Sequence, residues 1–228
     1  DSYRNPFYGD GQAAGGDGFA VYRKIFNYTW ANFADYRLNV NAEQDMYFDI
    51  KAGFEAQEYD DYVLQAGAQG FPENLNLQYL ASAATPNTAS SAPSDYSTNS
   101  IFSNVAFNYK DRYVVTGSFR RDGSSVFGSN KRWGNFYSVG ATWNVTEEAF
   151  MQTVDVLSML KLRASYGENG NALGFGFYAA LPTYGYGANY TGLPGSVLNN
   201  VGFEDLTWEK NKVLNIGLDF GFFNNTLN

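Results

Sequence analysis

Residues 46–57 read MYFDIKAGFEAQ, and apolar and polar side chains alternate along them without interruption. One face carries Met46, Phe48, Ile50, Ala52, Phe54 and Ala56, and the other carries Tyr47, Asp49, Lys51, Gly53, Glu55 and Gln57. A period of two residues is typical of a β-strand whose two faces meet different surroundings. This stretch therefore predicts a strand with one apolar side.

The same alternation recurs along most of the chain. It is found at residues 18–40, 101–109, 112–120, 133–145, 160–166 and 208–223. Lys110-Asp111 separates two of these segments and predicts a tight hairpin turn. The pattern predicts seven antiparallel strands and the beginning of an eighth after Asn224-Asn225.

The connections between these segments alternate between short and long. Short turns are expected at 41–45, 110–111 and 224–225, a medium loop at 121–132, and long loops at 61–100 and 168–206. Residues 146–158 predict a short helix capped by Thr146, with Glu147 and Glu148 in its first turn. In an up-and-down meander every second connection emerges at the same end, so the long loops should share one end and the turns the other.

Two architectures could use such strands, a soluble β-sandwich and a transmembrane β-barrel. A sandwich turns its apolar faces into a core and has no reason to sort loops by length. A barrel turns them to lipid, with short turns on one side and long loops on the other. Most segments also have the length of about 9 to 13 residues that suits a tilted spanning strand, and aromatic residues gather near their ends. The sequence thus favours an all-β, antiparallel, up-and-down transmembrane β-barrel segment.

Composition excludes several kinds of protein. The 228 residues include no Cys and no His, which rules out a disulfide framework, a thiolate nucleophile, a Ser-His-Asp triad and a structural zinc site. The net charge of −8 argues against nucleic acid as a partner. The neighbouring carboxylates Asp60-Asp61, Glu147-Glu148 and Glu204-Asp205 point apart on an extended chain. We therefore predict no catalytic, cofactor or metal site, and no enzyme.

Four stretches resemble the SusC/RagA-like TonB-dependent transporters of the Bacteroidota outer membrane. They are residues 109–128 (YKDRYVVTGSFRRDGSSVFG), 131–151 (KRWGNFYSVGATWNVTEEAFM), 160–171 (LKLRASYGENGN) and 206–228 (LTWEKNKVLNIGLDFGFFNNTLN), and AQGF at 68–71 resembles the family as well. The resemblance implies a 22-stranded barrel plugged by an amino-terminal domain, of which this chain would be roughly a third, taken from the middle. It also implies a SusD-like lipoprotein lid and energy supplied by TonB. No stretch resembles the plug, the TonB box or the final strand, so residues 1–228 are expected to be a fragment.

Three classes of function remain open. The first is active import of an oligomeric nutrient, with glycan the leading substrate and peptide a competitor. The second is a passive porin or a structural or adhesive surface barrel, whose strands would look alike in this window. The third is a soluble β-sandwich binding module.

Two groups of residues are candidates for contacts. The loop 172–206 carries aromatic side chains among Gly, Asn and Pro, which suit stacking on sugar rings or packing on a lid protein. A self-packed loop is the alternative. The candidates for ligand or lid contact are Phe177, Tyr178, Tyr184, Tyr186 and Tyr190.

The second group is basic and is expected at the outer membrane edge. Its members are Arg120, Arg121, Lys131 and Arg132. Guanidinium and ammonium groups suit lipopolysaccharide phosphates. The alternative is an internally paired loop base. Outer-membrane lipid and lipopolysaccharide are thus expected partners, and the outer membrane is the expected location.

Overall fold

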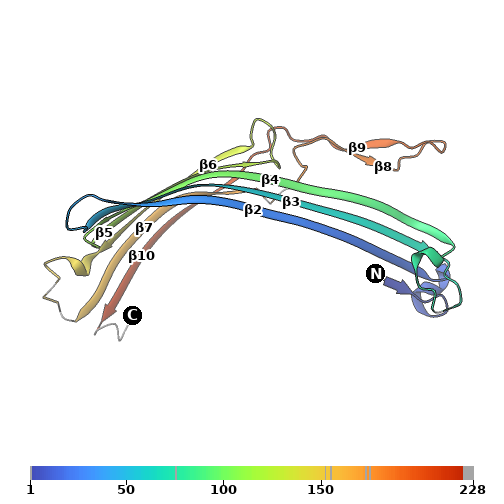
Figure 1. Ribbon diagram of the computed structural model, residues 1–228, viewed down its shortest axis with the longest axis horizontal. Helices are drawn as coiled ribbons and strands as arrows, with labels where there is room; N and C mark the ends of the chain where they lie inside the picture. The colour runs from blue at the N-terminus through green and yellow to red at the C-terminus, as the bar shows by residue number, and fades with distance from the viewer. Residues whose placement is uncertain are drawn as a thin grey trace. The chain divides into compact units, whose positions relative to one another are not determined.

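The computed structural model describes residues 2–74, 76–151, 153–154, 156–172, 174 and 176–222. Nearly all regular structure in them is antiparallel β, in one eight-stranded sheet and one hairpin (Figure 1). The strands of the large sheet are β1 (Ser2–Arg4), β2 (Asp17–Asn39), β3 (Met46–Gln69), β4 (Thr85–Tyr109), β5 (Tyr113–Ser124), β6 (Trp133–Asn144), β7 (Leu157–Asn171) and β10 (Glu209–Phe222). The hairpin is β8 (Thr183–Tyr186) with β9 (Ser196–Asn200), and the 3₁₀ helices are η1 (Gly9–Ala14), η2 (Leu80–Ser82) and η3 (Val145–Glu147). Within the described ranges, no helix has the length and apolar character needed to span a bilayer.

The large sheet is a meander with the order β1-β2-β3-β4-β5-β6-β7-β10. Each strand pairs with the next one along the chain, except that the β8–β9 hairpin is inserted between β7 and β10. This confirms the predicted antiparallel meander, and among the described strands β10 pairs with β7 alone. The predicted turn at Lys110-Asp111 is also confirmed, since both residues have the positive φ values, 55° and 51°, that a type I′ hairpin requires.

Strand length is where the sequence-based prediction was wrong. β3 and β4 have 24 and 25 residues, so the expected long loop at 61–100 is only the connection 70–84. Residues 85–97 read TPNTASSAPSDYS and show no alternation of apolar and polar residues. A strand needs no such alternation where a neighbouring strand satisfies its backbone hydrogen bonds. A prediction based on alternating polarity therefore does not find this part of β4.

The predicted helix at 146–158 is also wrong. In the described part of 146–158, the one helix is the 3₁₀ helix η3. Its N-cap is Asn144 rather than Thr146 and makes no capping hydrogen bond through its side chain. An isolated helix shorter than about 12 to 15 residues is marginal in water, and Glu148 binds side chains of β5 and β6 instead. Gln152 and Asp155 lie outside the described residues.

The chain divides into two units, Asp1–Tyr28 with Glu58–Tyr96, and Thr29–Gln57 with Ser97–Asn228. In the first unit, Phe71 of the AQGF stretch is 6% exposed and meets the ring of Tyr3 edge-on at 5.1 Å. A Cβ atom on Gly18 would lie 2.5 Å from the Phe71 ring. Gly18 thus leaves the space that this ring fills.

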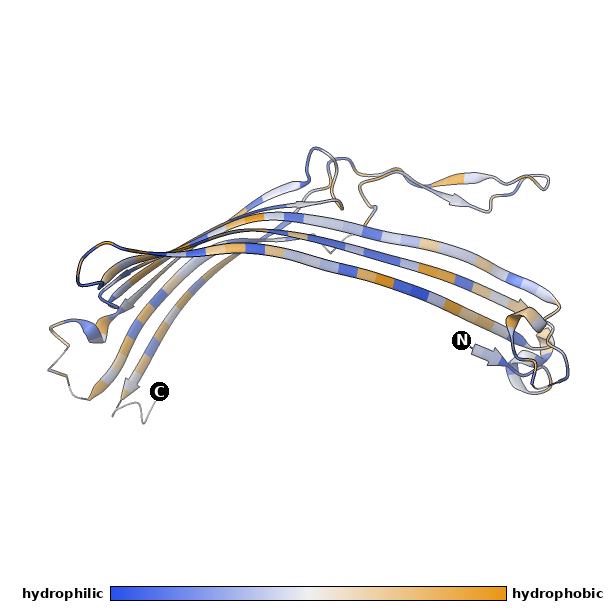
Figure 2. Ribbon diagram, viewed as in Figure 1, coloured by the Kyte–Doolittle hydropathy of each residue, from blue (hydrophilic) through white to orange (hydrophobic). Residues whose placement is uncertain are grey.

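In the second unit, one face of the sheet is apolar and uncovered. This face carries exposed apolar side chains, and Ile216 is 82% exposed. The others are Val115, Phe119, Val139, Leu162, Leu218 and Phe220. Phe48, Ile50 and Phe54 are half-buried, Phe48 beside Phe107 at 4.8 Å and Phe54 beside Trp30 at 5.9 Å. Figure 2 shows the alternation of orange and blue along the strands. No described strand forms a second sheet over this face, so the β-sandwich alternative is wrong.

Candidate functional site

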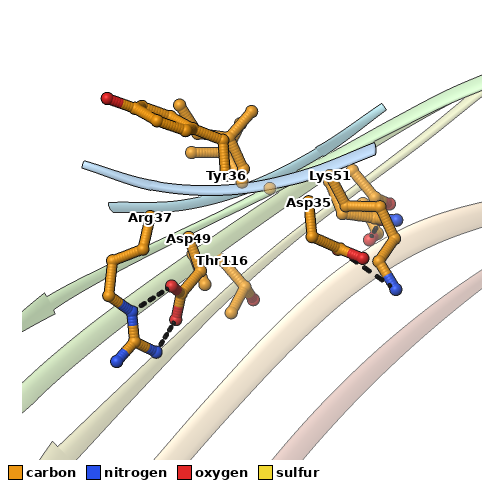
Figure 3. Close-up of a pocket in the computed structure, with 13 residues that line it drawn as sticks. Asp35, Tyr36, Arg37, Asp49, Lys51 and Thr116 are labelled. Carbon is orange, nitrogen blue, oxygen red and sulfur yellow. Dashed lines mark hydrogen bonds and ion pairs between the residues drawn. The ribbon is translucent and has the colours of Figure 1, made fainter. Parts of the chain in front are cut away.

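The polar face of the second unit carries a hollow of about 770 Å³ (Figure 3). Its rim is charged. Arg37 of β2 makes two hydrogen bonds to Asp49 of β3, at 2.6 and 2.8 Å, and Lys51 pairs with Asp35 at 3.3 Å. Tyr36 extends from the opposite side of β2. Asp49 and Lys51 thus share the polar face that the alternation at residues 46–57 predicted for them.

The floor of this hollow is built from small side chains. Thr116 and Ser118 come from β5, and Ser138 comes from β6. Ser118 and Ser138 are directly opposite each other, with their hydroxyl oxygens 2.6 Å apart. Short hydroxyl side chains keep the surface polar and leave room above it.

A second hollow of about 540 Å³ on the same unit contains Arg120. Its guanidinium donates hydrogen bonds to Asp122 at 2.7 Å, to Glu55 at 2.9 Å and to Ser100 at 2.9 Å. Glu168 is buried nearby, with Lys212 3.2 Å and Lys210 3.4 Å from its carboxylate. Most charges of this wall are thus paired across strands, which suits a polar surface facing water or protein.

The four basic candidates do not act as one group. Arg120 is on the polar face and bound to two carboxylates, whereas Arg121, its neighbour, is exposed, with its guanidinium 5.2 Å from the centre of the Trp133 ring. Lys131 and Arg132 are exposed in the connection between β5 and β6. Lipopolysaccharide contact stays a prediction for this set.

The aromatic candidates fall into two places. Tyr184, Tyr186 and Tyr190 belong to the β8–β9 hairpin and are 58%, 89% and 80% exposed. Phe177 and Tyr178 are half-buried at a turn where the Ala179 amide donates to the Gly176 carbonyl. The expected loop at 172–206 is therefore partly ordered as a hairpin that presents tyrosines.

Sequence reasoning missed that hairpin, and it also missed a small core formed by the connection between β5 and β6 with Trp208. Thr191-Gly192, with φ values of 50° and 83°, forms the tight turn between Tyr190 and Leu193, and an X-Gly pair was a usable signal. The core packs Val126 and Phe127, which are 0% and 1% exposed. Phe127 lies 4.8 Å from the ring of Trp208. The alternation of apolar and polar residues gives no information on contacts between residues so far apart along the chain.

At the turn end, Glu148 ties three side chains together. Its carboxylate accepts hydrogen bonds from the Tyr113 hydroxyl at 2.5 Å, the Trp143 indole at 3.1 Å and the Arg112 guanidinium at 3.2 Å. The hydrogen bond from Tyr113, aided by Trp143 and Arg112, lowers the pKa of Glu148 below its usual 4.5 even though desolvation opposes the shift. Tyr113 also stacks between Tyr109 and Trp143, at 6.4 and 6.3 Å. The carboxylate therefore holds an aromatic row in place.

This arrangement predicts a dependence on pH. Because the pKa of Glu148 is lower in the folded protein than in the unfolded chain, its stabilisation is complete above the usual pKa and is lost as the pH falls through the folded value. Thermal unfolding followed by tryptophan fluorescence between about pH 6 and pH 3 should show this loss in the assembled barrel. Glu148→Gln should flatten the profile, and Glu147→Gln, at an exposed neighbour, should leave it as in the unchanged protein.

Among the described residues, no three acidic, histidine or cysteine side chains gather closely enough to hold a metal ion. The arrangement offers a polar wall, an apolar wall and an exposed aromatic hairpin.

Comparison with known proteins agrees with this description. The family described as "TonB dependent receptor-like, beta-barrel" matches residues 1–228. The TonB-dependent receptor SusC of Bacteroides thetaiotaomicron is 33% identical over 211 residues, which are 87% of this chain and 20% of SusC. TonB-dependent receptor P3 of Formosa agariphila is 29% identical over 221 residues, which are 95% of this chain and 22% of P3.

Solved structures of the RagAB transporter have a similar fold. The RagAB peptide transporter superposes with a TM-score of 0.85 at 28% identity, over 92% of this chain and 23% of the matched chain. The RagAB importer in its "closed-closed" state gives 0.85 at 29% identity over the same shares. The chain thus spans about a fifth of the length of the curated relatives it matches. It belongs to the TonB-dependent receptor β-barrel family, as a SusC/RagA-like barrel segment of the outer-membrane type.

Proposed function

We propose that this chain forms part of the wall and outer loops of an outer-membrane importer that takes up oligomeric nutrients with energy from TonB. The observation that carries the proposal is the division of one sheet into an uncovered apolar face and a polar face of paired charges. An apolar outer face lets the sheet meet lipid, and the polar face lines a water-filled or protein-filled lumen. The family match supports TonB-driven import over the passive porin and the adhesive barrel.

The substrate we propose is a glycan, with peptide as the second candidate. Exposed tyrosines beside hydroxyl and amide groups suit the apolar face and the hydroxyls of a sugar ring. The peptide alternative is supported by the likeness to the RagAB peptide transporter. We propose that a SusD-like surface lipoprotein covers the loop end, and that plug and TonB box belong to parts of the transporter beyond residues 1–228.

Dependence on TonB tests the proposed class of function. Cells that express the full-length transporter should lose uptake of the oligomeric substrate when TonB is deleted, because active import needs energy from the inner membrane. A passive porin would keep its uptake. Unchanged uptake in the deletion strain would overturn the proposal.

The hairpin tyrosines give a more local prediction. Changing Tyr184, Tyr186 and Tyr190 together to Ala should reduce uptake or lid affinity by about tenfold or more, since each stacked ring contributes about 0.5 to 1.5 kcal/mol. Barrel assembly should survive, because this hairpin is a sheet separate from the eight-stranded one. Uptake of labelled oligosaccharide and pull-down of the lid measure the two effects.

A matched variant separates contact from folding of the hairpin. Changing the same three residues to Phe keeps the rings and removes the hydroxyls, so stacking should persist. Unchanged uptake and unchanged lid binding in the Ala variant would show that the tyrosines only pack against their own loop.

A further inference from the structure

The cations at the loop end of β5 and β6 differ from most other cations of the second unit, which are paired with carboxylates. Arg37, Arg120 and Arg163 each lie within 2.9 Å of a carboxylate oxygen. Arg121, Lys131 and Arg132, in contrast, have no carboxylate within 4.0 Å in the part of the chain that the structure describes. In a chain with 23 Asp and Glu against 15 Lys and Arg, three neighbouring cations without such a partner leave a local surplus of positive charge.

Arg121 is held in place by its surroundings. Its guanidinium lies over the Trp133 ring at 5.2 Å, and that ring in turn covers Gly123, where a Cβ atom would come within 3.0 Å of it. Gly123 and Trp133 are cross-strand partners, and Arg121 is paired with Asn135. The Arg-Trp stack leaves the N–H groups of the guanidinium free to bind an anion in its plane.

The position of this stack coincides with the edge of the apolar face. Phe119 and Val115 precede Arg121 on the same face of β5, since side chains two residues apart share a face. On β6, Trp133 and Trp143 bracket the outward residues Tyr137, Val139 and Ala141. The segment from Trp133 to Trp143 has 11 residues, counting both tryptophans. A tilted strand needs about 9 to 11 residues to cross hydrocarbon. Arg121 therefore lies at the level of the lipid headgroups on the loop side.

A small hollow of about 160 Å³ opens beside the stack. Arg132 and Trp133 line it together with Ser97, Asn99 and Ser125, and no carboxylate is among its lining residues. Backbone hydrogen bonds fix the edge of this hollow. The Ser124 amide donates to the Arg132 carbonyl at 3.1 Å, and the Ser125 amide donates to the Ser97 carbonyl at 3.0 Å. Arg121 does not line the hollow, but its guanidinium lies over Trp133, which does. Guanidinium, hydroxyl and amide groups are donors that a phosphate group binds.

We infer that Arg121 and Arg132, with Ser97, Asn99, Ser125 and Trp133, form a site for the phosphate of an anionic lipid of the outer leaflet, such as the lipid A phosphate of lipopolysaccharide. Lys131 adds to the positive potential, and Arg120 takes no part because it is bound to Glu55 and Asp122 on the polar face. The inference rests on the proposed insertion in the outer membrane and adds a defined lipid contact to it.

The test compares lipid binding by the full-length transporter and by its Arg121→Gln/Arg132→Gln variant, both purified from outer membranes in mild detergent. Bisphosphorylated lipid A is titrated and followed by native mass spectrometry, with dephosphorylated lipid A as the ligand control. Each lost guanidinium should weaken binding by about tenfold, because charge-assisted hydrogen bonds are among the strong ones. Arg4→Gln/Lys161→Gln makes the same change of charge at residues that are not part of the proposed site and have no ion pair in the described ranges, and it should bind like the unchanged protein.

Further measurements distinguish failure of the proposed function from failure of the proposed lipid site. Fractionation and heat-modifiability on gels show whether the variant inserts as a barrel, and absence of the unchanged protein from the outer membrane would defeat the proposed function itself. Correct insertion with equal lipid A binding by the double variant would overturn the site alone. Equal binding of dephosphorylated lipid A, or displacement of lipid A by millimolar inorganic phosphate, would overturn a lipid phosphate as its occupant.

Discussion

Ile216→Arg is expected to destabilise the assembled barrel by about 2 to 4 kcal/mol, the cost of an arginine at the bilayer midplane. Ile216 is 82% exposed and lies opposite Ala164 of β7 on the apolar face. A guanidinium there would face hydrocarbon, in which its charge has no partner. Urea unfolding of the full-length protein in lipid vesicles, followed by tryptophan fluorescence, measures the change.

The residue before it supplies the control. Asn215 is exposed on the other face, opposite Ser165, and lines a hollow with Thr142 and Arg163. Asn215→Arg introduces the same side chain on the polar face, so its unfolding free energy should stay within about 0.5 kcal/mol of the unchanged protein. Equal destabilisation by the two variants would contradict the assignment of the faces.

Phe127→Ala should cost about 3 to 5 kcal/mol of the local stability of the loop end, since it removes a ring that is 1% exposed. The ring packs on Trp208, while the adjoining Gly128 approaches the chain so closely that a Cβ would lie 1.7 Å from the Glu204 carbonyl oxygen. Loss of the ring should release the 125–132 connection from residues 204–208. Faster hydrogen exchange and protease cleavage in these two segments measure that release.

Two control variants test whether the effect comes from the buried ring of Phe127. Phe127→Leu keeps most of the apolar volume and should cost less than about 1.5 kcal/mol. Phe203→Ala removes a ring of the same kind at a site that is 65% exposed, and it should leave exchange in both segments unchanged. Protection that persists in Phe127→Ala would show that backbone bonds alone hold the two segments together.

The sequence alone determined the fold class, the two faces and most strand positions. Residues 46–57 alternate so regularly that β3 begins at the predicted residue, and the alternation at 208–223 corresponds to β10, in which Ile216 and Asn215 lie on opposite faces. Alternation is readable because each residue of a spanning strand meets either an apolar or a polar surrounding. The resemblance to SusC/RagA-like transporters, quoted from the sequence, was confirmed by the family match.

Only the tertiary structure decided how far the strands run and which distant residues meet. Residues 85–97 belong to β4 and its backbone pairing, although their side chains show no alternation of polarity. Glu148 looked like part of the first turn of a helix, but hydrogen bonds from Tyr113 and Trp143 fix it at the ends of two strands. Arg120 and Arg121 are adjacent in sequence yet serve opposite faces, one inside a network of carboxylates and the other stacked on Trp133. Periodicity assigns a residue to a face, but its partners come from other strands, and the register between strands places them beside it.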